Sequence, residues 1–251
     1  MKAEIISIGD ELLIGQTINT NASWIGKEIS EAGIDVVRVT TISDLSEEIE
    51  DAVREAMVRA DYVFITGGLG PTKDDITKST LASFFNSELI LDAELLKRIE
   101  SFFEVRGRQM IQSNIDQAKI PANCKVIDNH EGTACGMWFV EQGVHLFSMP
   151  GVPYEMKAMM SNSIIPLVKD QIGKIDKKTK TVLIQGIGES FLAEKVFDWE
   201  NEIRANGFGL AYLPSPGIIR MRISYQSESD DVLVDSFFER LRLMIPKNFI
   251  G

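Results

Sequence analysis

The stretch that decides the fold is Thr66-Gly67-Gly68-Leu69-Gly70-Pro71-Thr72-Lys73-Asp74-Asp75. An apolar run, Tyr62-Val63-Phe64-Ile65, precedes it, and a helical pattern begins near Thr77. A strand, a glycine-rich loop and a helix in this order place backbone N–H groups and a helix N-terminus against an anion. The loop matches neither the P-loop pattern nor the dinucleotide-binding pattern.

The side chains of this loop narrow the chemistry. Its three glycines allow a ligand to approach the backbone closely, and Lys73 supplies a mobile positive charge that suits phosphate. Asp74 and Asp75 would repel a phosphate group. Their presence in a phosphate-binding loop is expected only if they bind a metal ion or take part in a reaction. The combination predicts a phosphorylated ligand with a divalent cation. The alternative is a tight structural loop in which Asp75 caps the following helix.

Strands and helices alternate around this loop. Apolar runs predict strands over residues 3–8 and 36–39, and helical spacing predicts helices after Asn21 and after a cap at Asp44 or Ser46. This alternation predicts an α/β fold with a doubly wound, mostly parallel sheet in three layers. Ligands of such sheets bind outside the carboxyl ends of the strands, where Gly9-Asp10-Glu11, Asp44 and the glycine loop lie.

The second half of the chain adds another loop and another domain. Pro150-Gly151-Val152-Pro153 follows a strand and predicts either a rigid ligand loop or a structural turn with Pro153 at the first helical position. Residues 92–118 have a helical pattern, which Arg106-Gly107-Arg108 is expected to break or bend. A charged linker at 173–178 predicts two domains, residues 1–172 and a smaller α+β domain at 177–251. The smaller domain has a β-α-β-β-α pattern: strands at 181–185, 208–213 and 218–225, and helices at 189–205 and 230–243.

The composition of the chain limits which binding partners and which cellular compartment are expected for the protein. The net charge of −11 and the pI of about 4.8 argue against nucleic acid or an anionic membrane surface as partner. Cys124 and Cys135 lack the spacing of a zinc site, and two reduced thiols are expected rather than a disulfide. The start of the chain lacks a signal-peptide pattern, and no apolar stretch is long enough for a membrane span. A cytoplasmic protein is therefore expected.

Four stretches resemble the competence/damage-inducible protein family CinA. Residues 7–15, Ser-Ile-Gly-Asp-Glu-Leu-Leu-Ile-Gly, with Asn19-Thr20-Asn21 are similar to the start of that family, and residues 66–75 are similar to its central loop. Glu131-Gly132-Thr133-Ala134 and residues 150–156, Pro-Gly-Val-Pro-Tyr-Glu-Met, resemble its later motifs. The resemblance covers nearly the whole chain. The first domain is also similar to the molybdopterin-binding domains of molybdenum-cofactor biosynthesis.

The resemblance implies a molybdopterin-binding-like fold, a small middle domain and a homodimer. Full-length CinA proteins usually continue into a nicotinamide-nucleotide amidohydrolase domain, which this sequence lacks, so deamidation is not expected of it. The implied activity is metal-dependent cleavage of the pyrophosphate in ADP-ribose or a related nucleotide, giving AMP and ribose 5-phosphate. The alternatives are a molybdopterin-binding or adenylyl-transfer module and a non-catalytic scaffold that assembles an amidohydrolase domain.

The candidate site combines these motifs. Asp44, Asp75 and Lys73 are the expected catalytic residues, and Asp44 and Asp75 are also the expected ligands of a divalent metal such as Mg²⁺. The residues expected to bind the nucleotide are Gly9, Asp10, Glu11, Asn19, Gly67, Gly68, Gly70, Thr72, Asp74, Gly132, Thr133, Pro150, Gly151 and Pro153. Neither histidine is placed for nucleophilic catalysis with serine or cysteine.

Overall fold

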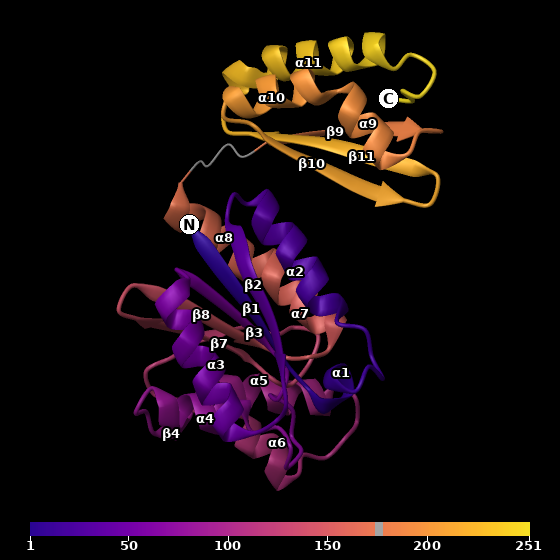
Figure 1. Cartoon of the computed structure of the whole chain (residues 1–251). Coiled ribbons are helices and arrows are strands. Elements are labelled where there is room, and N and C mark those ends of the chain that lie inside the picture. The colour runs from indigo at the N-terminus through magenta and orange to yellow at the C-terminus, as the bar shows by residue number, and fades with distance from the viewer. Residues whose placement is uncertain (174–177) are drawn as a thin grey trace. The chain divides into compact units, whose positions relative to one another are not determined.

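The computed structural model describes residues 1–173 and 178–251. They form two compact units that meet in the sequence at Gly173 (Figure 1). Most of the linker predicted at 173–178 lies outside the described residues. No described helix is both long and apolar enough to cross a membrane.

The first unit contains a six-stranded sheet in the order β2-β1-β3-β8-β7-β6. Strands β1, β2, β3 and β8 are parallel neighbours, and β7 pairs in the antiparallel direction with both β8 and β6. The prediction of a mostly parallel sheet is therefore confirmed. The bounds are β1 Lys2–Ile8, β2 Asp35–Ile42, β3 Tyr62–Thr66, β6 Lys125–Ile127, β7 Gly136–Glu141 and β8 Val144–Met149.

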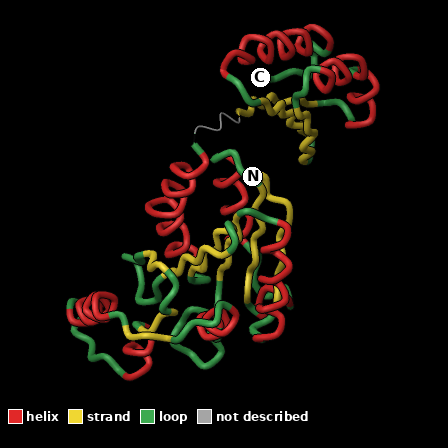
Figure 2. The backbone as a smooth tube through the Cα atoms, turned by 90° about the vertical axis from the view of Figure 1, so that its left-hand side faces the viewer, coloured by secondary structure: helices red, strands yellow, loops and turns green. Residues whose placement is uncertain are grey.

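Helices cover both faces of this sheet, and Figure 2 shows its strands between two layers of helices. Alternate residues of β1 explain the layering, because Ile5 packs with α2, α7 and α8 whereas Ile6 packs with α3 and α4. Both isoleucines are fully buried. The bounds are α1 Asp10–Leu13, α2 Thr20–Glu31, α3 Ser46–Arg59, α4 Thr77–Phe84, α7 Pro153–Met159, η1 Met160–Ile164 and α8 Ile165–Ile172.

A small subdomain follows α4. It consists of β4 (Leu89–Leu91) paired with β5 (Lys119–Pro121), together with α5 (Ala93–Glu104) and α6 (Gln112–Gln117). The break expected at 106–108 in the helical pattern over 92–118 is present, since α5 ends at Glu104, Gly107 adopts a left-handed φ of 63° and α6 begins at Gln112. Leu95 and Ile99 of α5 are buried in the core of this subdomain.

The second unit has a three-stranded antiparallel sheet in the order β10-β11-β9, with its helices on one face (Figures 1 and 2). The predicted helix over 189–205 is interrupted at Val196. Trp199 and Phe237 lie in the core. The bounds are β9 Lys178–Gln185, α9 Glu189–Lys195, α10 Phe197–Ala205, β10 Gly209–Ser215, β11 Ile218–Tyr225, η2 Glu228–Asp230 and α11 Asp231–Met244.

Both cysteines are free, as predicted. The β6–β7 ladder pairs Lys125 with Trp138 and Ile127 with Gly136. Cys124 precedes β6 and Cys135 precedes β7, so they lie at opposite ends of this short antiparallel ladder.

Candidate active site

The carboxyl ends of four parallel strands meet at one edge of the sheet. The ladders pair Ile8 of β1 with Ile42 of β2 and Thr66 of β3 with Met149 of β8. The loops that follow these strands are therefore neighbours in space, although they are separated by up to about 140 positions in the sequence. They carry the acidic and glycine-rich motifs of the candidate site.

Close backbone approach explains the glycine that follows β3. The Gly67 N–H donates to the Met149 carbonyl at 3.1 Å, and its φ of 112° disfavours other residues. A Cβ on Gly67 would overlap the Ile8 carbonyl, and a Cβ on Gly151 would lie 3.4 Å from Gly67 Cα. The backbones of three loops thus come together here, and at Gly67 there is no room for a side chain.

These loops surround a cleft of about 290 Å³, here called the acidic cleft. Its lining combines backbone from the glycine loop with four carboxylate side chains. The lining residues are Ile8, Gly9, Glu11, Asp44, Gly67, Gly68, Leu69, Asp74, Asp75, Gly151 and Val152. The structure thus places Asp44 and Asp75, from different strand ends, on the same cavity.

The electrostatics of the acidic cleft centre on Asp44. Burial raises the pKa of Asp44, a hydrogen bond from the Asp10 backbone opposes that rise, and repulsion by Asp10, Glu11 and Asp75 adds to it. These neighbouring carboxylates leave a concentration of negative charge that no described basic side chain bonds to. A cation would relieve this repulsion.

Asp75 is held by its own loop. Its Oδ2 accepts hydrogen bonds from the Thr72 N–H at 2.9 Å and from Thr72 Oγ1 at 2.6 Å. The prediction that Asp75 caps α4 is wrong, because the cap position is Ile76 and no side chain caps the helix. The predicted cap of α3 by Asp44 or Ser46 is also wrong, since Leu45 occupies that position without a side-chain cap.

A smaller hollow of about 100 Å³ adjoins the acidic cleft and shares Ile8, Glu11 and Gly151 with it. Asn19 and Pro153, both expected at the site, line this hollow. Sequence reasoning did not select Asn21, which also lines it. Asn21 Nδ2 donates to the Gly151 carbonyl at 2.7 Å and so connects the start of α2 to the loop that follows β8.

Several expected site residues line neither cavity. Asp10 acts on Asp44 through its backbone and charge, while Gly70 lies against the Asp75 carboxylate. The side chain of Lys73 is exposed. The expected residues outside both linings are Asp10, Gly70, Thr72, Lys73, Gly132, Thr133 and Pro150.

Gly132 belongs to a separate contact. A Cβ there would meet the carboxylate of Glu155, which is 8% exposed and accepts a hydrogen bond from Asn129 Nδ2 at 2.6 Å. Asn129 Oδ1 in turn accepts from the Gly132 N–H at 3.1 Å. This contact joins the loop that contains Gly132 and Thr133 to the first turn of α7.

Two carboxylates of the acidic cleft are of a type that could take part in holding a divalent metal ion. Within residues 1–173 and 178–251, no group of three or more His, Cys, Asp or Glu is arranged to hold a metal ion. Asp44 and Asp75 supply hard oxygen donors on one cavity. Mg²⁺ is commonly held by one or two carboxylates, with phosphate oxygens and water completing its octahedron, so these residues fit it.

Comparison with known proteins identifies the family. A family model described as "Probable molybdopterin binding domain" matches residues 4–170. The chain belongs to this family. A CinA-like protein of Flavobacterium psychrophilum is 42% identical over the whole chain, and one of Cytophaga hutchinsonii is 41% identical over 97% of it. The chain spans 61% and 58% of the length of these two relatives.

A solved structure supports the same relationship. The crystal structure of CinA from Thermoplasma acidophilum, described as having unknown function, has a TM-score of 0.61 and is 35% identical. The match covers 67% of this chain and 96% of the archaeal one. The resemblance to CinA found in the sequence motifs is thereby confirmed.

Proposed function

We propose that the first unit is a metal-dependent hydrolase that cleaves the pyrophosphate of ADP-ribose or a related nucleotide. Water and ADP-ribose would give AMP and ribose 5-phosphate, with one P–O bond broken and one formed. The observation that carries this proposal is the shared cavity of Asp44 and Asp75 beside the Gly67–Gly70 loop.

The residues of the cleft suit this chemistry. Backbone amides of the glycine loop would donate to the pyrophosphate, and Lys73 would reach the phosphates from the solvent side. A divalent ion held by Asp44 and Asp75 would neutralise phosphate charge and lower the pKa of a bound water. Asp10 and Glu11 add negative charge nearby, which favours cation binding over binding of the free anion.

The test is product analysis with the full chain. ADP-ribose and a panel of other nucleoside diphosphate sugars are incubated with Mg²⁺, Mn²⁺ or Co²⁺, and phosphate-containing products are separated by chromatography. AMP and ribose 5-phosphate are expected from ADP-ribose. The proposal is wrong if no metal supports release of AMP.

Isosteric variants assign the roles of the acids. Asp44→Asn and Asp75→Asn keep the size of each side chain, and in the second variant the amide oxygen would still accept the hydrogen bonds from Thr72. Each is expected to abolish turnover while the circular dichroism spectrum stays unchanged. Asp170→Asn, at an exposed position on α8, is the matched control and should hydrolyse ADP-ribose at the parent rate. Parent rates for both cleft variants would refute the assignment.

A second function, a molybdopterin-binding or adenylyl-transfer module, is supported by the family match over residues 4–170. The same acidic cleft would then hold the pterin phosphate and a nucleotide. Titration with molybdopterin and with ADP-ribose separates the two proposals. Tight pterin binding without turnover of any nucleotide would favour the second function.

A further inference from the structure

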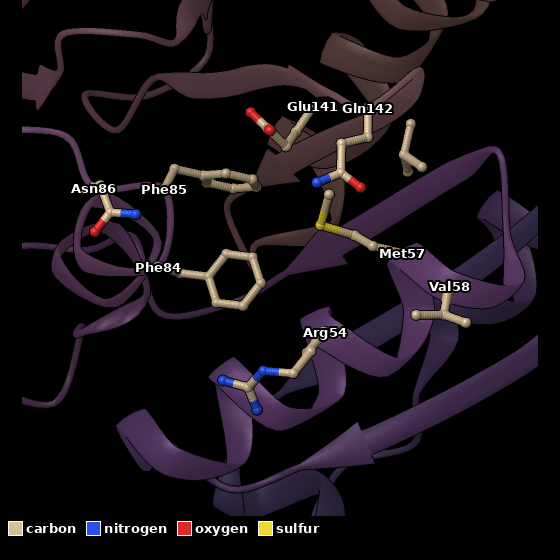
Figure 3. A pocket seen from close by; sticks show the side chains of 9 residues that line it. Arg54, Met57, Val58, Phe84, Phe85, Asn86, Glu141 and Gln142 are labelled. Atoms are coloured by element: carbon tan, nitrogen blue, oxygen red, sulfur yellow. The ribbon is translucent and has the colours of Figure 1, made fainter.

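A second cavity, here called the aromatic cavity, lies at the opposite end of the first unit's sheet from the acidic cleft. It has a volume of about 390 Å³, and its walls come from α3, the end of α4 and the β7–β8 turn (Figure 3). Val144, the first residue of β8, lines this cavity, whereas the acidic cleft lies beyond Met149 at the end of the same strand. The two cavities are therefore separated by the length of β8, roughly 17 Å at the usual rise per residue. The lining of the aromatic cavity includes Arg54, Phe84, Phe85, Asn86, Glu141 and Gln142.

One wall of the aromatic cavity is built from rings. The Phe84 and Phe85 rings pack edge to face at 5.0 Å between centroids, and Phe85 stacks on Phe139 at 4.5 Å. Both Phe84 and Phe85 remain partly exposed. The Arg54 guanidinium lies 5.8 Å from the centre of the Phe84 ring, and Figure 3 shows Phe84 between Phe85 and Arg54. Aromatic rings and a planar guanidinium together suit a flat ligand that stacks.

Two side-chain amides lie on either side of these rings. Asn86 follows α4 and Gln142 belongs to the β7–β8 turn, and Figure 3 shows the two phenylalanines between them. In the part of the chain that the structure describes, neither side-chain amide makes a hydrogen bond to the protein. Each amide has two donor hydrogens and an acceptor oxygen. The cavity therefore offers polar groups to the edge of a ligand whose face meets the rings.

The backbone of Gln142 is unusual for a glutamine. Glu141 pairs with Val144, so Gln142 and Gly143 form a two-residue turn, and their φ angles are 51° and 83°. Such turns prefer Asn-Gly, because asparagine tolerates the left-handed conformation better than most residues. Unfavourable backbone conformations cluster at sites of ligand binding. Glutamine reaches one methylene further than asparagine, and here its side chain lines the cavity.

The charges around the aromatic cavity disfavour an anionic ligand. Arg54 already pairs with Glu50 and Asp51 on its own helix. Glu141 lines the cavity and forms no ion pair with a basic side chain among residues 1–173 and 178–251. The charge that is not balanced locally is therefore negative. An uncharged ring fits this environment better than a ring that carries a phosphate.

We propose that the aromatic cavity binds an uncharged, planar heteroaromatic ring of the purine base or nucleoside class. The ring would stack on Phe84, and its edge would bond to the amides of Asn86 and Gln142. A purine has a face that stacks on aromatic side chains and an edge with both donors and acceptors. Small-molecule sites begin at about 300 Å³, so the volume of about 390 Å³ is sufficient. The site shares no lining residue with the acidic cleft and does not depend on the proposed hydrolase activity.

Binding of adenosine tests the proposal. The full chain is titrated with adenosine by calorimetry in the presence of EDTA, so that the acidic cleft has no divalent cation to hold a phosphate. A dissociation constant below about 1 mM is expected. AMP should bind at least about threefold more weakly than adenosine, because its phosphate adds negative charge beside Glu141. Adenosine should slow hydrogen exchange at the end of α3 and in the β7–β8 turn, and not in the glycine loop.

The variant Gln142→Asn separates binding from folding. Asparagine suits the left-handed turn better, so this variant should be at least as stable as the parent in thermal unfolding. Its amide is one methylene shorter, and adenosine should bind roughly tenfold more weakly. Phe84→Leu keeps an apolar side chain but removes the stacking face, and a loss of roughly tenfold is expected here as well. Gln109→Asn, at an exposed glutamine in the loop after α5, is the matched control and should bind adenosine with the parent affinity.

Three results would overturn the proposal. The first is no detectable binding of adenosine at about 1 mM, whether or not the chain hydrolyses ADP-ribose. The second is AMP binding in EDTA that equals or exceeds adenosine binding, since the ligand would then not be an uncharged one. The third is parent affinity in both Gln142→Asn and Phe84→Leu, or protection from exchange confined to the glycine loop, because adenosine would then bind elsewhere.

Discussion

Substitution of Gly68 by alanine tests why the glycine loop requires glycine at this position. Gly68 has a φ of 65° and Gly107, in the loop after α5, has a φ of 63°. A Cβ at Gly107 would meet nothing within 4 Å, whereas a Cβ at Gly68 would overlap Thr77 Oγ1 and lie 3.1 Å from Thr77 Cβ. The substitutions Gly68→Ala and Gly107→Ala therefore share the penalty of a left-handed backbone and differ in the clash with Thr77.

The expected magnitudes follow from this difference. The left-handed conformation costs an alanine about 1 kcal/mol at either position. Overpacking against the fully buried Thr77 adds about 2 kcal/mol at Gly68 alone. Gly107→Ala should thus lower the free energy of unfolding by about 1 kcal/mol and Gly68→Ala by about 3 kcal/mol.

The substitution Thr77→Ala removes the overlap between a Cβ at position 68 and Thr77 Oγ1. This Oγ1 is buried without a hydrogen-bond partner among the described residues, so Thr77→Ala sacrifices no described hydrogen bond. In the double variant Gly68→Ala/Thr77→Ala the overlap with Oγ1 disappears, and the two changes should cost about 1–2 kcal/mol less than their sum.

The assay must report on the first unit alone, because two compact units need not unfold together. Hydrogen exchange measured by mass spectrometry on peptides from β1 and β3 gives the local free energy of opening. If Gly68→Ala costs no more than Gly107→Ala, the close approach to Thr77 is not the reason for glycine. Equal costs in the presence and absence of the Thr77 hydroxyl would refute the reasoning in the same way.

Three further experiments test other parts of the structure. Burial raises the pKa of Cys135 to about 11, so about one thiol in a thousand is ionised at pH 8, and site-resolved alkylation should be slow until the protein unfolds or the pH rises toward 11. Gly132→Ala should destabilise the first unit by about 2 kcal/mol through contact with the Glu155 carboxylate, and a double-mutant cycle with Glu155→Ala should show strong coupling in hydrogen exchange. Trp199→Phe removes the 2.8 Å hydrogen bond to the buried Phe237 carbonyl and should lower the stability of the second unit by about 1–2 kcal/mol, measured by exchange in α11.

The layered sheet could be predicted because each strand and helix shows its type in the apolar pattern of its own short segment. The run Tyr62–Ile65 is apolar at every position, as a strand buried on both faces requires, and the structure buries all of β3. The spacing of Ile25 and Ile29 likewise marks the buried side of α2. Such periodic patterns fix the element types and, through the rules for connecting parallel strands, their arrangement.

The ends of helices were harder to predict, since they depend on contacts that the sequence does not display. Asp75 is of a residue type that often caps helices and stands just before α4, but its side chain accepts a hydrogen bond from Thr72 and lines the acidic cleft. The break after α5 is an exception, because Gly107 marks it in the sequence and adopts a left-handed φ there. Asn21 could have been found, because it stands in the Asn19-Thr20-Asn21 run at the start of α2, but its partner Gly151 is 130 positions away.

The charge of the cleft determines how a nucleotide could bind there. Glu11 and Asp75 already repel Asp44, and a diphosphate would bring further negative charge to the same cavity. At about 4 Å each additional pair of like charges costs from about 1 kcal/mol in water to about 4 kcal/mol near a protein surface. Under the proposed function, a cation is therefore required for affinity as well as for chemistry. Because linkage is reciprocal, the factor by which the cation tightens nucleotide binding must equal the factor by which the nucleotide tightens cation binding.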